Sequence, residues 1–312
     1  MSQEIQEDSP DLWMQHMRTG AFEEAWKKSD ADLKARVGKP CWHLPRHFQY
    51  IWNGTTLENK RVLVRCYHGL GDTIQFIRYV PLLKAIAARV IVWAQASLIP
   101  LLETMPGIDQ LLPLHDGTPE VEYDMDVEIM ELPHIFRTTL ATIPSVIPYL
   151  HVEPLLLSSN KEKLSVGLVW KAGDWDERRS LAFSALAALA LVPGIKLYML
   201  QANAKAAGWQ EEFGVYPGEF NLFDYARVVR GLDLMISVDS MPAHLAGALG
   251  VPVWTLLHTE ADWRWLDNRD DSPWYPTMRL FRQEQPGDWS TLIQRIAAEL
   301  NKLIKQKKIQ SS

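Results

Sequence analysis

The spacing of hydrophobic and polar positions changes at about residue 60 of this 312-residue chain. Before that point, apolar side chains such as Trp13 and Met17 recur at helical spacing until Thr19-Gly20 interrupts them, which predicts two short helices. After it, short apolar runs alternate with amphipathic segments, the order expected of parallel strands joined by helices. The expected strands cover residues 61–67, 90–94, 110–114, 123–129, 165–170, 196–201, 234–238, 251–257 and 278–283. The expected helices between and after them cover residues 72–88, 98–104, 182–191, 223–230, 242–249 and 290–305.

A proline-rich break at residues 144–154, followed by the polar run 158–160, divides this pattern into two halves. We therefore expect an α/β protein with two facing, Rossmann-like, doubly wound domains, over residues 60–150 and 161–312. Residues 1–59 are predicted to form a helical hairpin, which resembles a single tetratricopeptide-like unit, and a connector. We expect the hairpin to cap the domain that follows it.

A glycine-rich turn follows the first expected strand. In Gly69-Leu70-Gly71-Asp72, the glycines let the backbone turn tightly and approach a ligand, and the helix start that follows can hold an anion. The turn lacks the full dinucleotide-binding fingerprint, so it is a weak signal by itself. Asp72 is either an ordinary capping residue, worth about 1 kcal/mol, or a residue with a chemical role.

Cations gather after the strand at residues 165–170. Lys171 ends that strand, and Arg178 and Arg179 lie in the polar loop beyond it. At the carboxyl end of a parallel sheet these side chains suit a diphosphate. A solvated loop is the alternative.

The third candidate segment opens the helix after the strand at residues 234–238. Asp239 ends the strand, Ser240 can cap the helix, and Pro242 fits a first turn because its missing N–H would be unpaired there. The free N–H groups of such a helix start form a seat for phosphate. His244, one turn further on, is also compatible with a packed, hydrogen-bonded core residue.

Together these segments resemble the glycosyltransferase family typified by the bacterial lipopolysaccharide heptosyltransferases (glycosyltransferase family nine), and especially the branch often fused to tetratricopeptide repeats. The matching stretches lie at residues 69–79, 166–170, 234–254, 262–266 and 271–276. The resemblance implies the GT-B fold, with the acceptor held by the first domain, a nucleotide-sugar by the second, and a closing helix that lies back against the first domain. It also implies an inverting transfer that needs no metal and no cofactor, since the nucleotide-sugar is a substrate.

The resemblance further implies roles for single residues. Asp72 matches the aspartate proposed as general base, and Asp239, Ser240 and His244 match the nucleotide-sugar motif. The residues predicted to bind donor or phosphate are Lys171, Arg178, Arg179, Gln201, Asp239, Ser240, Met241 and His244. The predicted acceptor-side loop comprises Gly69, Leu70, Gly71 and Thr73. Ser240-Met241-Pro242 stands where repeat-fused relatives more often have Thr-Ala-Val, which leaves the donor sugar open.

Composition narrows the class of partner and the compartment. The formal net charge of −6 argues against nucleic acid, and the lysine cluster at residues 302–308 suits the solvated end of the last helix. Cys41 and Cys66 match no metal-binding spacing, and the acidic first ten residues do not form a signal peptide, so we expect a cytoplasmic protein. Peripheral membrane contact through the basic tail and protein docking through the hairpin are minor alternatives.

Thirteen tryptophans are many for this length, and four of them lie close together in the sequence at Trp263, Trp265, Trp274 and Trp289. We expect packing in the core and between domains, with a stacking platform for a sugar or base as the alternative.

These observations predict an inverting, metal-independent glycosyltransferase that moves a sugar from a nucleotide-sugar to a glycan, a lipid-linked glycan or a protein. The main alternative is a catalytically silent module on the same fold that binds a nucleotide-sugar or a partner protein. A nucleotide-sugar epimerase would need further acids and bases around the sugar, and the sequence identifies none.

Overall fold

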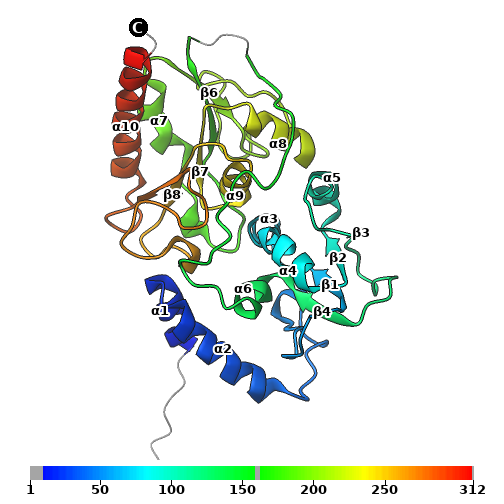
Figure 1. The fold of residues 1–312 in the computed structure, drawn as a ribbon. Helices are drawn as coiled ribbons and strands as arrows, with labels where there is room; N and C mark the ends of the chain where they lie inside the picture. Colours follow the sequence, from blue (N-terminus) through cyan, green and yellow to red (C-terminus); the bar gives the residue numbers. More distant parts are fainter. Residues whose placement is uncertain (1–9, 159–161, 311–312) are drawn as a thin grey trace, which may run out of the picture.

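The structure is a computed structural model that describes residues 10–158 and 162–310. It contains two parallel β-sheets that share no strand, so the predicted pair of α/β domains is confirmed (Figure 1). The first sheet has the order β3-β2-β1-β4, with strands β1 (Arg61–Arg65), β2 (Arg89–Ala94), β3 (Gln110–Pro113) and β4 (Met125–Glu128). The second has the order β6-β5-β7-β8-β9, with strands β5 (Leu164–Val169), β6 (Ile195–Met199), β7 (Leu234–Val238), β8 (Val253–Leu257) and β9 (Met278–Arg282).

Short helices connect these strands. The first domain contains α3 (Leu70–Phe76), α4 (Val80–Ile86), α5 (Ile99–Leu102) and α6 (Leu132–Ile135), with 3-10 turns η2 (Ile77–Tyr79), η3 (Ala96–Leu98) and η4 (Ile129–Glu131). The second contains α7 (Ala187–Ala190), α8 (Leu222–Arg230), α9 (Met241–Ala248) and α10 (Trp289–Gln310), with 3-10 turns η5 (Glu177–Arg179), η6 (Phe183–Leu186) and η7 (Trp263–Trp265). The hairpin and connector contain α1 (Pro10–Thr19), α2 (Phe22–Arg36) and η1 (Arg46–Phe48).

The segment expected to form one helix over residues 72–88 is interrupted. Helix α3 ends at Phe76, the 3-10 turn η2 follows, and α4 begins at Val80 with Pro81 in its first turn. Proline lacks an N–H and its ring would clash with the carbonyl four residues earlier, so a continuous helix cannot pass through Pro81. Helix α3 is therefore short, and it lies at the domain boundary against α9.

The core continues from one domain into the other. Alternate residues of β1 face opposite sides of the first sheet, so Val62 and Val64 join the large core while Leu63 packs with Ile91 and Trp93 in a separate small cluster. The main core includes residues of both sheets and of the helices between them. The two domains are therefore packed against each other rather than merely tethered.

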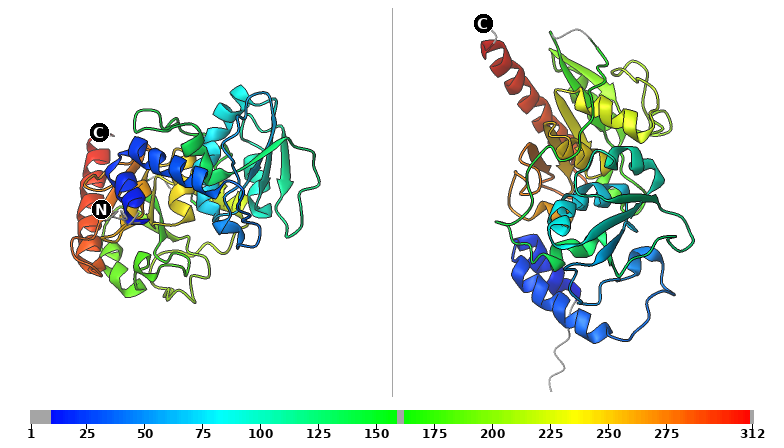
Figure 2. Two further views of the ribbon diagram at one scale, coloured as in Figure 1. Left: turned by 90° about the horizontal axis from the view of Figure 1, so that it is seen from below. Right: turned by 45° about the vertical axis from the view of Figure 1, so that its right-hand side comes forward.

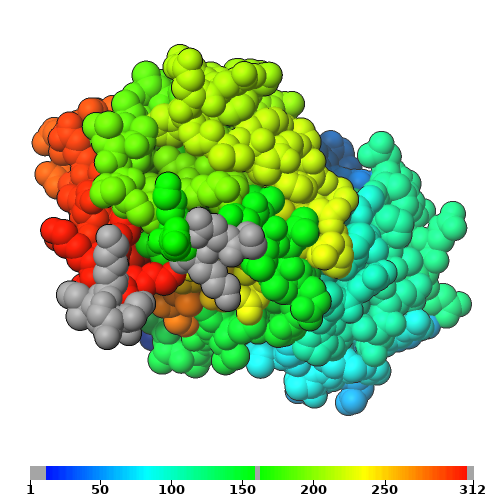
Figure 3. Space-filling view, turned by 90° about the horizontal axis from the view of Figure 1, so that it is seen from above, coloured from blue at the N-terminus to red at the C-terminus, as the bar shows by residue number. Residues whose placement is uncertain are grey.

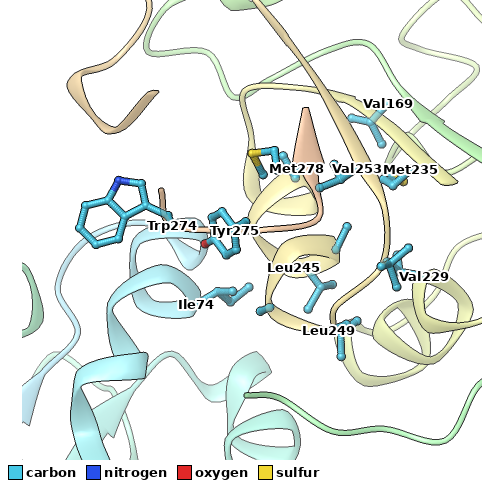
Figure 4. Close-up of a cluster of buried hydrophobic side chains, with 14 of the residues drawn as sticks. Ile74, Val169, Val229, Met235, Leu245, Leu249, Val253, Trp274, Tyr275 and Met278 are labelled. Carbon is cyan, nitrogen blue, oxygen red and sulfur yellow. The ribbon is translucent and has the colours of Figure 1, made fainter. Parts of the chain in front are cut away.

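Helix α9 lies where the two domains meet. It contacts β7 and β8 of its own sheet and also α3 of the first domain. Figure 4 shows Ile74 of α3 near Leu245 and Tyr275, on the side of α9 that faces away from the second sheet. A Cβ atom at Gly247 would lie 2.3 Å from Cδ1 of Tyr275, so the missing side chain of this glycine lets the ring rest on the helix. Seen from above, the surface of the second domain also abuts the first where α8 contacts η3 and α5 (Figure 3).

The N-terminal hairpin packs against the first domain, as expected, and also against the second domain. Trp13 of α1 meets Trp263 of η7 edge to face at 5.9 Å between ring centroids, and Arg18 forms an ion pair with Asp267 at 3.0 Å. On the other side, the indole N–H of Trp26 in α2 donates to the carbonyl of Thr138 at 2.7 Å. The left view in Figure 2, from below, shows α1 beside the orange segment of the second domain.

The late tryptophans serve packing at this junction. The Trp263 and Trp274 rings lie 6.2 Å apart, and each contacts Phe22 of the hairpin and Phe76 of the first domain. Trp265 and Trp274 are fully buried, which rules out a stacking platform at those two positions.

Helix α10 does not return to the first domain. It packs on α7, η6 and β9 of its own domain (Figure 1). The expectation of a closing helix laid against the first domain is therefore wrong, and the hairpin and the η7 loop make the cross-domain contacts instead. No helix within the described residues is long and apolar enough to cross a membrane.

Candidate active site

Two adjoining pockets form one cleft at the carboxyl ends of the second sheet. The larger, of about 410 Å³, lies over β5, β6 and β7, and the smaller, of about 260 Å³, lies between the two domains. Gly173, Ser240 and Met241 line both pockets, so the start of α9 marks their junction. Ligands of open parallel sheets bind at this edge, outside the carboxyl ends of the strands.

The start of α9 is left uncovered by side chains. Ser240 occupies the N-cap position, but its hydroxyl donates to the carbonyl of Val238 at 3.2 Å and accepts no helix N–H, contrary to the expected cap. Pro242 lies in the first turn, as expected, and has no N–H to offer. The backbone at Met241 is therefore the first-turn donor beside both pockets, and an acceptor from a ligand suits it.

The larger pocket combines apolar walls with a few polar groups. Leu200, Phe220 and Tyr225 line it, together with the predicted Lys171 and Gln201. The amide oxygen of Gln201 accepts from the backbone N–H groups of Trp170 and Lys171, at 3.2 and 2.8 Å, and so fixes the chain where β5 ends. The Lys171 side chain is left exposed at the pocket.

Asp72 lies on the opposite wall of the smaller pocket, in the first turn of α3. Its Oδ2 accepts from the N–H of the N-cap residue Gly69 at 2.9 Å and so satisfies one free backbone donor at the helix start. Its Oδ1 accepts from Nη2 of Arg264 at 2.5 Å, a residue of the second domain. Asp72 is thus both a helix-capping residue and one partner of an ion pair that joins the two domains.

Arg264 and Asp262 also line this site, although the sequence around them predicted no role for either residue. Arg264 is 9% exposed, and its Nη1 donates to Oδ1 of Asp262 at 2.8 Å. The stretch 262–266 contributed to the family resemblance, so its charged residues were the available signal. Trp175 was missed as well, although its ring covers the Arg179 guanidinium at 4.0 Å and lines the pocket.

Asp239 and Arg179 complete the charged wall of the smaller pocket. Burial, with the nearby charge of Asp262, raises the pKa of Asp239 to about 6. Arg179 is 7% exposed, and its Nη1 donates to the backbone carbonyl of Asp239 at 3.0 Å. Three carboxyl groups (Asp72, Asp239 and Asp262) and two guanidinium groups therefore surround this pocket.

His244 is a packed residue with one edge on the cleft. Its ring stacks on Trp265 at 5.2 Å, and its Nδ1 lies 3.0 Å from the hydroxyl of Tyr275. Burial lowers the pKa of His244 well below its ordinary value, so the ring is neutral at pH 7. A Cβ atom at Gly71 would lie 3.0 Å from Cδ2 of this ring, so Gly71 lets the two helix starts approach.

Most of the predicted site residues come together in this cleft, but two do not line it. Arg178 points away and forms ion pairs with Asp176 and Glu260 beside a separate pocket. Thr73 is fully buried, and its hydroxyl donates to the side chain of Gln95 at 3.0 Å. The glycine turn Gly69-Leu70-Gly71 lines the smaller pocket as expected.

A His–carboxylate pair lies beside the glycine turn. Nδ1 of His68 lies 2.9 Å from Oε1 of Glu128, a residue at the end of β4 that is 1% exposed. This contact raises the pKa of His68 against the opposing effect of burial. Among the residues that the structure describes, no group of three or more His, Cys, Asp or Glu side chains is arranged to hold a metal ion.

The chain was compared with known protein families. Residues 170–286, which run from the end of β5 past β9, match the model of glycosyltransferase family 9 (heptosyltransferase). This segment of the chain is therefore similar to glycosyltransferase family 9. The matched segment contains every residue that lines the larger pocket except Val169, whereas Asp72 and its turn come from the domain before it.

A curated relative covers more of the chain. Protein FlbA of Caulobacter vibrioides is 27% identical over 318 residues, which is 90% of this chain and 52% of FlbA. The chain thus spans about half the length of this relative.

Solved structures agree on the fold. A family 9 glycosyltransferase from Veillonella parvula matches 82% of this chain and 100% of its own, with a TM-score of 0.58 and 13% identity. The ADP-heptose lipopolysaccharide heptosyltransferase II of E. coli matches 80% and 99%, with a TM-score of 0.54 and 18% identity. The iron-containing, dodecameric glycosyltransferase TibC of enterotoxigenic E. coli matches 82% and 78%, with a TM-score of 0.51 and 12% identity. The chain therefore has the predicted GT-B fold of the heptosyltransferases.

Proposed function

We propose that this protein is an inverting glycosyltransferase that transfers a sugar from a nucleotide-sugar to an acceptor hydroxyl. The observation that carries the proposal is the continuous cleft, in which Asp72 of the first domain faces the start of α9 and Arg179 of the second domain. Direct displacement requires a bound nucleotide-sugar and a nearby group that accepts the proton of the acceptor hydroxyl, and the two walls of the cleft can supply these.

The donor fits the cleft in one direction. Its nucleoside lies in the larger pocket, where Leu200, Phe220 and Tyr225 provide apolar surface for a base. Its diphosphate passes over the start of α9, within reach of the Met241 N–H and Lys171. Its sugar then enters the smaller pocket, beside Asp72.

The chemistry follows from this placement. Asp72 accepts the proton of the acceptor hydroxyl while the hydroxyl oxygen forms a bond to the anomeric carbon. The bond from that carbon to the diphosphate breaks, and the electron pair leaves with the phosphate oxygen. Lys171, Arg179 and the uncovered helix start stabilise the charge that develops there.

A thermal-shift panel tests the donor assignment. ADP, UDP, GDP and their sugar conjugates are added one at a time, with ADP-heptose first because the E. coli relative is named for it. A ligand at 100 times its dissociation constant adds about 2.7 kcal/mol to the free energy of unfolding. No stabilisation by any member, with Lys171→Ala as the matched site variant, would remove the proposed donor site.

Turnover separates the enzyme from the silent module. The donor that stabilises the protein most is incubated with glycan, lipid-linked glycan and protein acceptors, and release of the nucleoside diphosphate is followed. Binding without transfer or hydrolysis favours the silent module. Proton NMR of the product gives the anomeric configuration, and retention would contradict direct displacement.

Metal independence belongs to the same proposal. Transfer persists after treatment with a chelator, because Lys171, Arg179 and the helix start supply the positive charge at the diphosphate. Loss of activity on chelation that added iron or magnesium restores would overturn this part, and TibC makes iron the first metal to test.

A further inference from the structure

One side chain reaches across the domain boundary and contacts the proposed base. Arg264 lies in η7 of the second domain, and its Nη2 donates to Oδ1 of Asp72 in the first domain. The two residues are 192 positions apart in the sequence, so this contact exists only when the domains are docked. Arg264 is buried and its second terminal nitrogen is held by Asp262 at 2.8 Å.

The loop that presents Arg264 is fixed from three directions. The carboxylate of Asp262 accepts the backbone N–H of Arg264 at 3.0 Å and so caps the turn. The Arg264 guanidinium lies over the rings of Trp263 and Phe76, at 4.9 and 5.4 Å from their centroids. Helix α1 of the hairpin packs on the outer side of η7. These contacts hold the buried Arg264 side chain in one orientation, so its guanidinium is already aligned with Asp72.

We propose that Arg264 is a positioning residue that makes Asp72 competent for proton transfer only when the two domains are docked. The inference rests on the proposed function and deepens it, because it names what couples the donor-bearing domain to the base. Arg264 acts through Asp72 and touches neither the acceptor hydroxyl nor the anomeric carbon.

The hydrogen bonds of Asp72 show how this works. The Gly69 N–H holds Oδ2 and Arg264 holds Oδ1, so the plane of the carboxylate is set by one contact from each domain. A carboxylate offers about four lone-pair sites, so the acceptor hydroxyl can still be accepted while both contacts remain. Without Arg264 the carboxylate keeps only its helix-side contact, and its alignment with the incoming hydroxyl is lost.

Other charges face the same pocket from every side and are present in each variant. Besides Arg264 itself, the η7 segment contributes Asp262, and His68 lies in the turn before α3, next to the pocket-lining Gly69. The remaining charged or titratable groups around the pocket are Arg179, Asp239 and His244. A pH profile would titrate all of these groups together. The test therefore changes Arg264 and its direct partner Asp72, singly and in combination.

A double-mutant cycle tests the coupling. Arg264→Gln and Arg264→Lys are made in the wild-type chain and in the Asp72→Asn chain, and transfer is measured with ADP-heptose or the panel nucleotide-sugar that stabilises the protein most. We expect Arg264→Gln to lower kcat by about 10-fold to 100-fold, since a misplaced catalytic group loses about that much. We expect Arg264→Lys to recover part of it, and Arg264→Gln to add nothing in the Asp72→Asn chain.

Two further measurements separate positioning from a general loss of structure. Donor affinity by calorimetry should stay within about twofold in Arg264→Gln, because the Arg264 guanidinium contacts Asp72, Asp262 and the sulfur of Met130 and does not line the larger pocket. Millimolar guanidinium restores part of the activity of Arg264→Ala, in which the removed group leaves a buried space. Arg18→Met is the matched control, because it loosens the same loop at Asp267 without touching Asp72.

The outcomes are distinct. Wild-type kcat in Arg264→Gln, or an equal loss in the Asp72→Asn chain, overturns this inference alone. A loss of donor affinity without a loss of kcat would make Arg264 a donor ligand and also overturns it. If the unmodified protein binds nucleotides but shows no turnover, the proposed function fails, and the inference fails with it.

Discussion

The two pockets of the cleft are built on different principles. The larger pocket, of about 410 Å³, belongs to one domain and is walled by apolar side chains and backbone. The smaller, of about 260 Å³, belongs to both domains and is walled by charged side chains that pair with one another across the boundary. Shape and burial fix the first, whereas charge and domain docking fix the second. Changes in the larger pocket should therefore alter affinity, and changes in the smaller one should alter rate or stability.

The largest effect is expected at Asp72. Asp72→Asn keeps the size of the side chain and an oxygen that can accept the Gly69 N–H at the helix start. If Asp72 is the proposed base, turnover should fall by roughly 10²–10⁴-fold. Donor affinity, measured by calorimetry, should change little because the proposed seats of the nucleoside and the diphosphate lie in the other domain. Full turnover in this variant would mean that the base lies elsewhere, and His68 with Glu128 would be the next pair to test.

A pH-dependent gain in stability is expected at Asp239. The pKa of Asp239 is raised from 3.8 to about 6, so the folded state binds a proton more tightly than the unfolded state. The free energy of unfolding therefore falls as pH rises from about 4 to about 6, and the loss stays in place above that range. Asp239→Asn removes the penalty, and we expect up to about 3 kcal/mol more stability at pH 8.

Urea denaturation at several pH values measures this effect. The difference between Asp239→Asn and wild type should vanish below about pH 4 and reach its full size above about pH 7. Asp116→Asn, at an exposed position, is the control and should show no such trend. A gain of the same size at pH 4 would point to packing rather than charge.

An effect on affinity alone is expected at Lys171. The exposed ammonium lies at the edge of the larger pocket, and a charge-assisted hydrogen bond to a phosphate is worth about 1.5–3 kcal/mol. Lys171→Ala should therefore weaken donor binding by roughly 10-fold to 100-fold. The melting temperature without ligand should not change, and calorimetry with the selected nucleotide-sugar gives the affinity. Unchanged affinity would place the diphosphate away from Lys171.

The smallest effect is expected at Arg178. This side chain pairs with Asp176 and Glu260 outside the cleft, so it is a matched comparison for Lys171 with the same charge and a different position. Arg178→Ala should change donor affinity by less than about twofold, since exposed ion pairs contribute at most about 1 kcal/mol. A loss as large as that of Lys171→Ala would show that the loop moves when the donor binds.

Local patterns were enough for the strands but not for the contacts between domains. The run at residues 234–238 is apolar except for Ser237 and is followed by a charged residue, so its bounds were predicted as the structure has them. The helix expected over residues 72–88 failed because its apolar spacing was read without the effect of Pro81 on the backbone. Within one element, sequence spacing and backbone chemistry decide the outcome.

The charged wall of the site shows what sequence could not give. Asp72 was found because a glycine turn and a helix start surround it, whereas Arg264 has no local mark of function. Its role depends on a partner 192 residues away, and nothing in the periodicity of either segment brings the two together. Arg178 and Arg179 are neighbours in sequence, yet only Arg179 turns into the cleft, because the 3-10 turn η5 sends their side chains in different directions.

The packing of the first helices against the last loops has a consequence for biosynthesis. The ring of Trp13 contacts that of Trp263, 250 residues later in the chain, and the ring of Phe22 contacts that of Trp274. During translation the hairpin therefore emerges with an apolar face that stays open to water until most of the chain has been made. Contacts of such long sequence separation slow folding and leave hydrophobic surface exposed in the meantime. Ribosome-bound chains that stop before residue 263 should bind chaperones through this hairpin, and longer chains should release them.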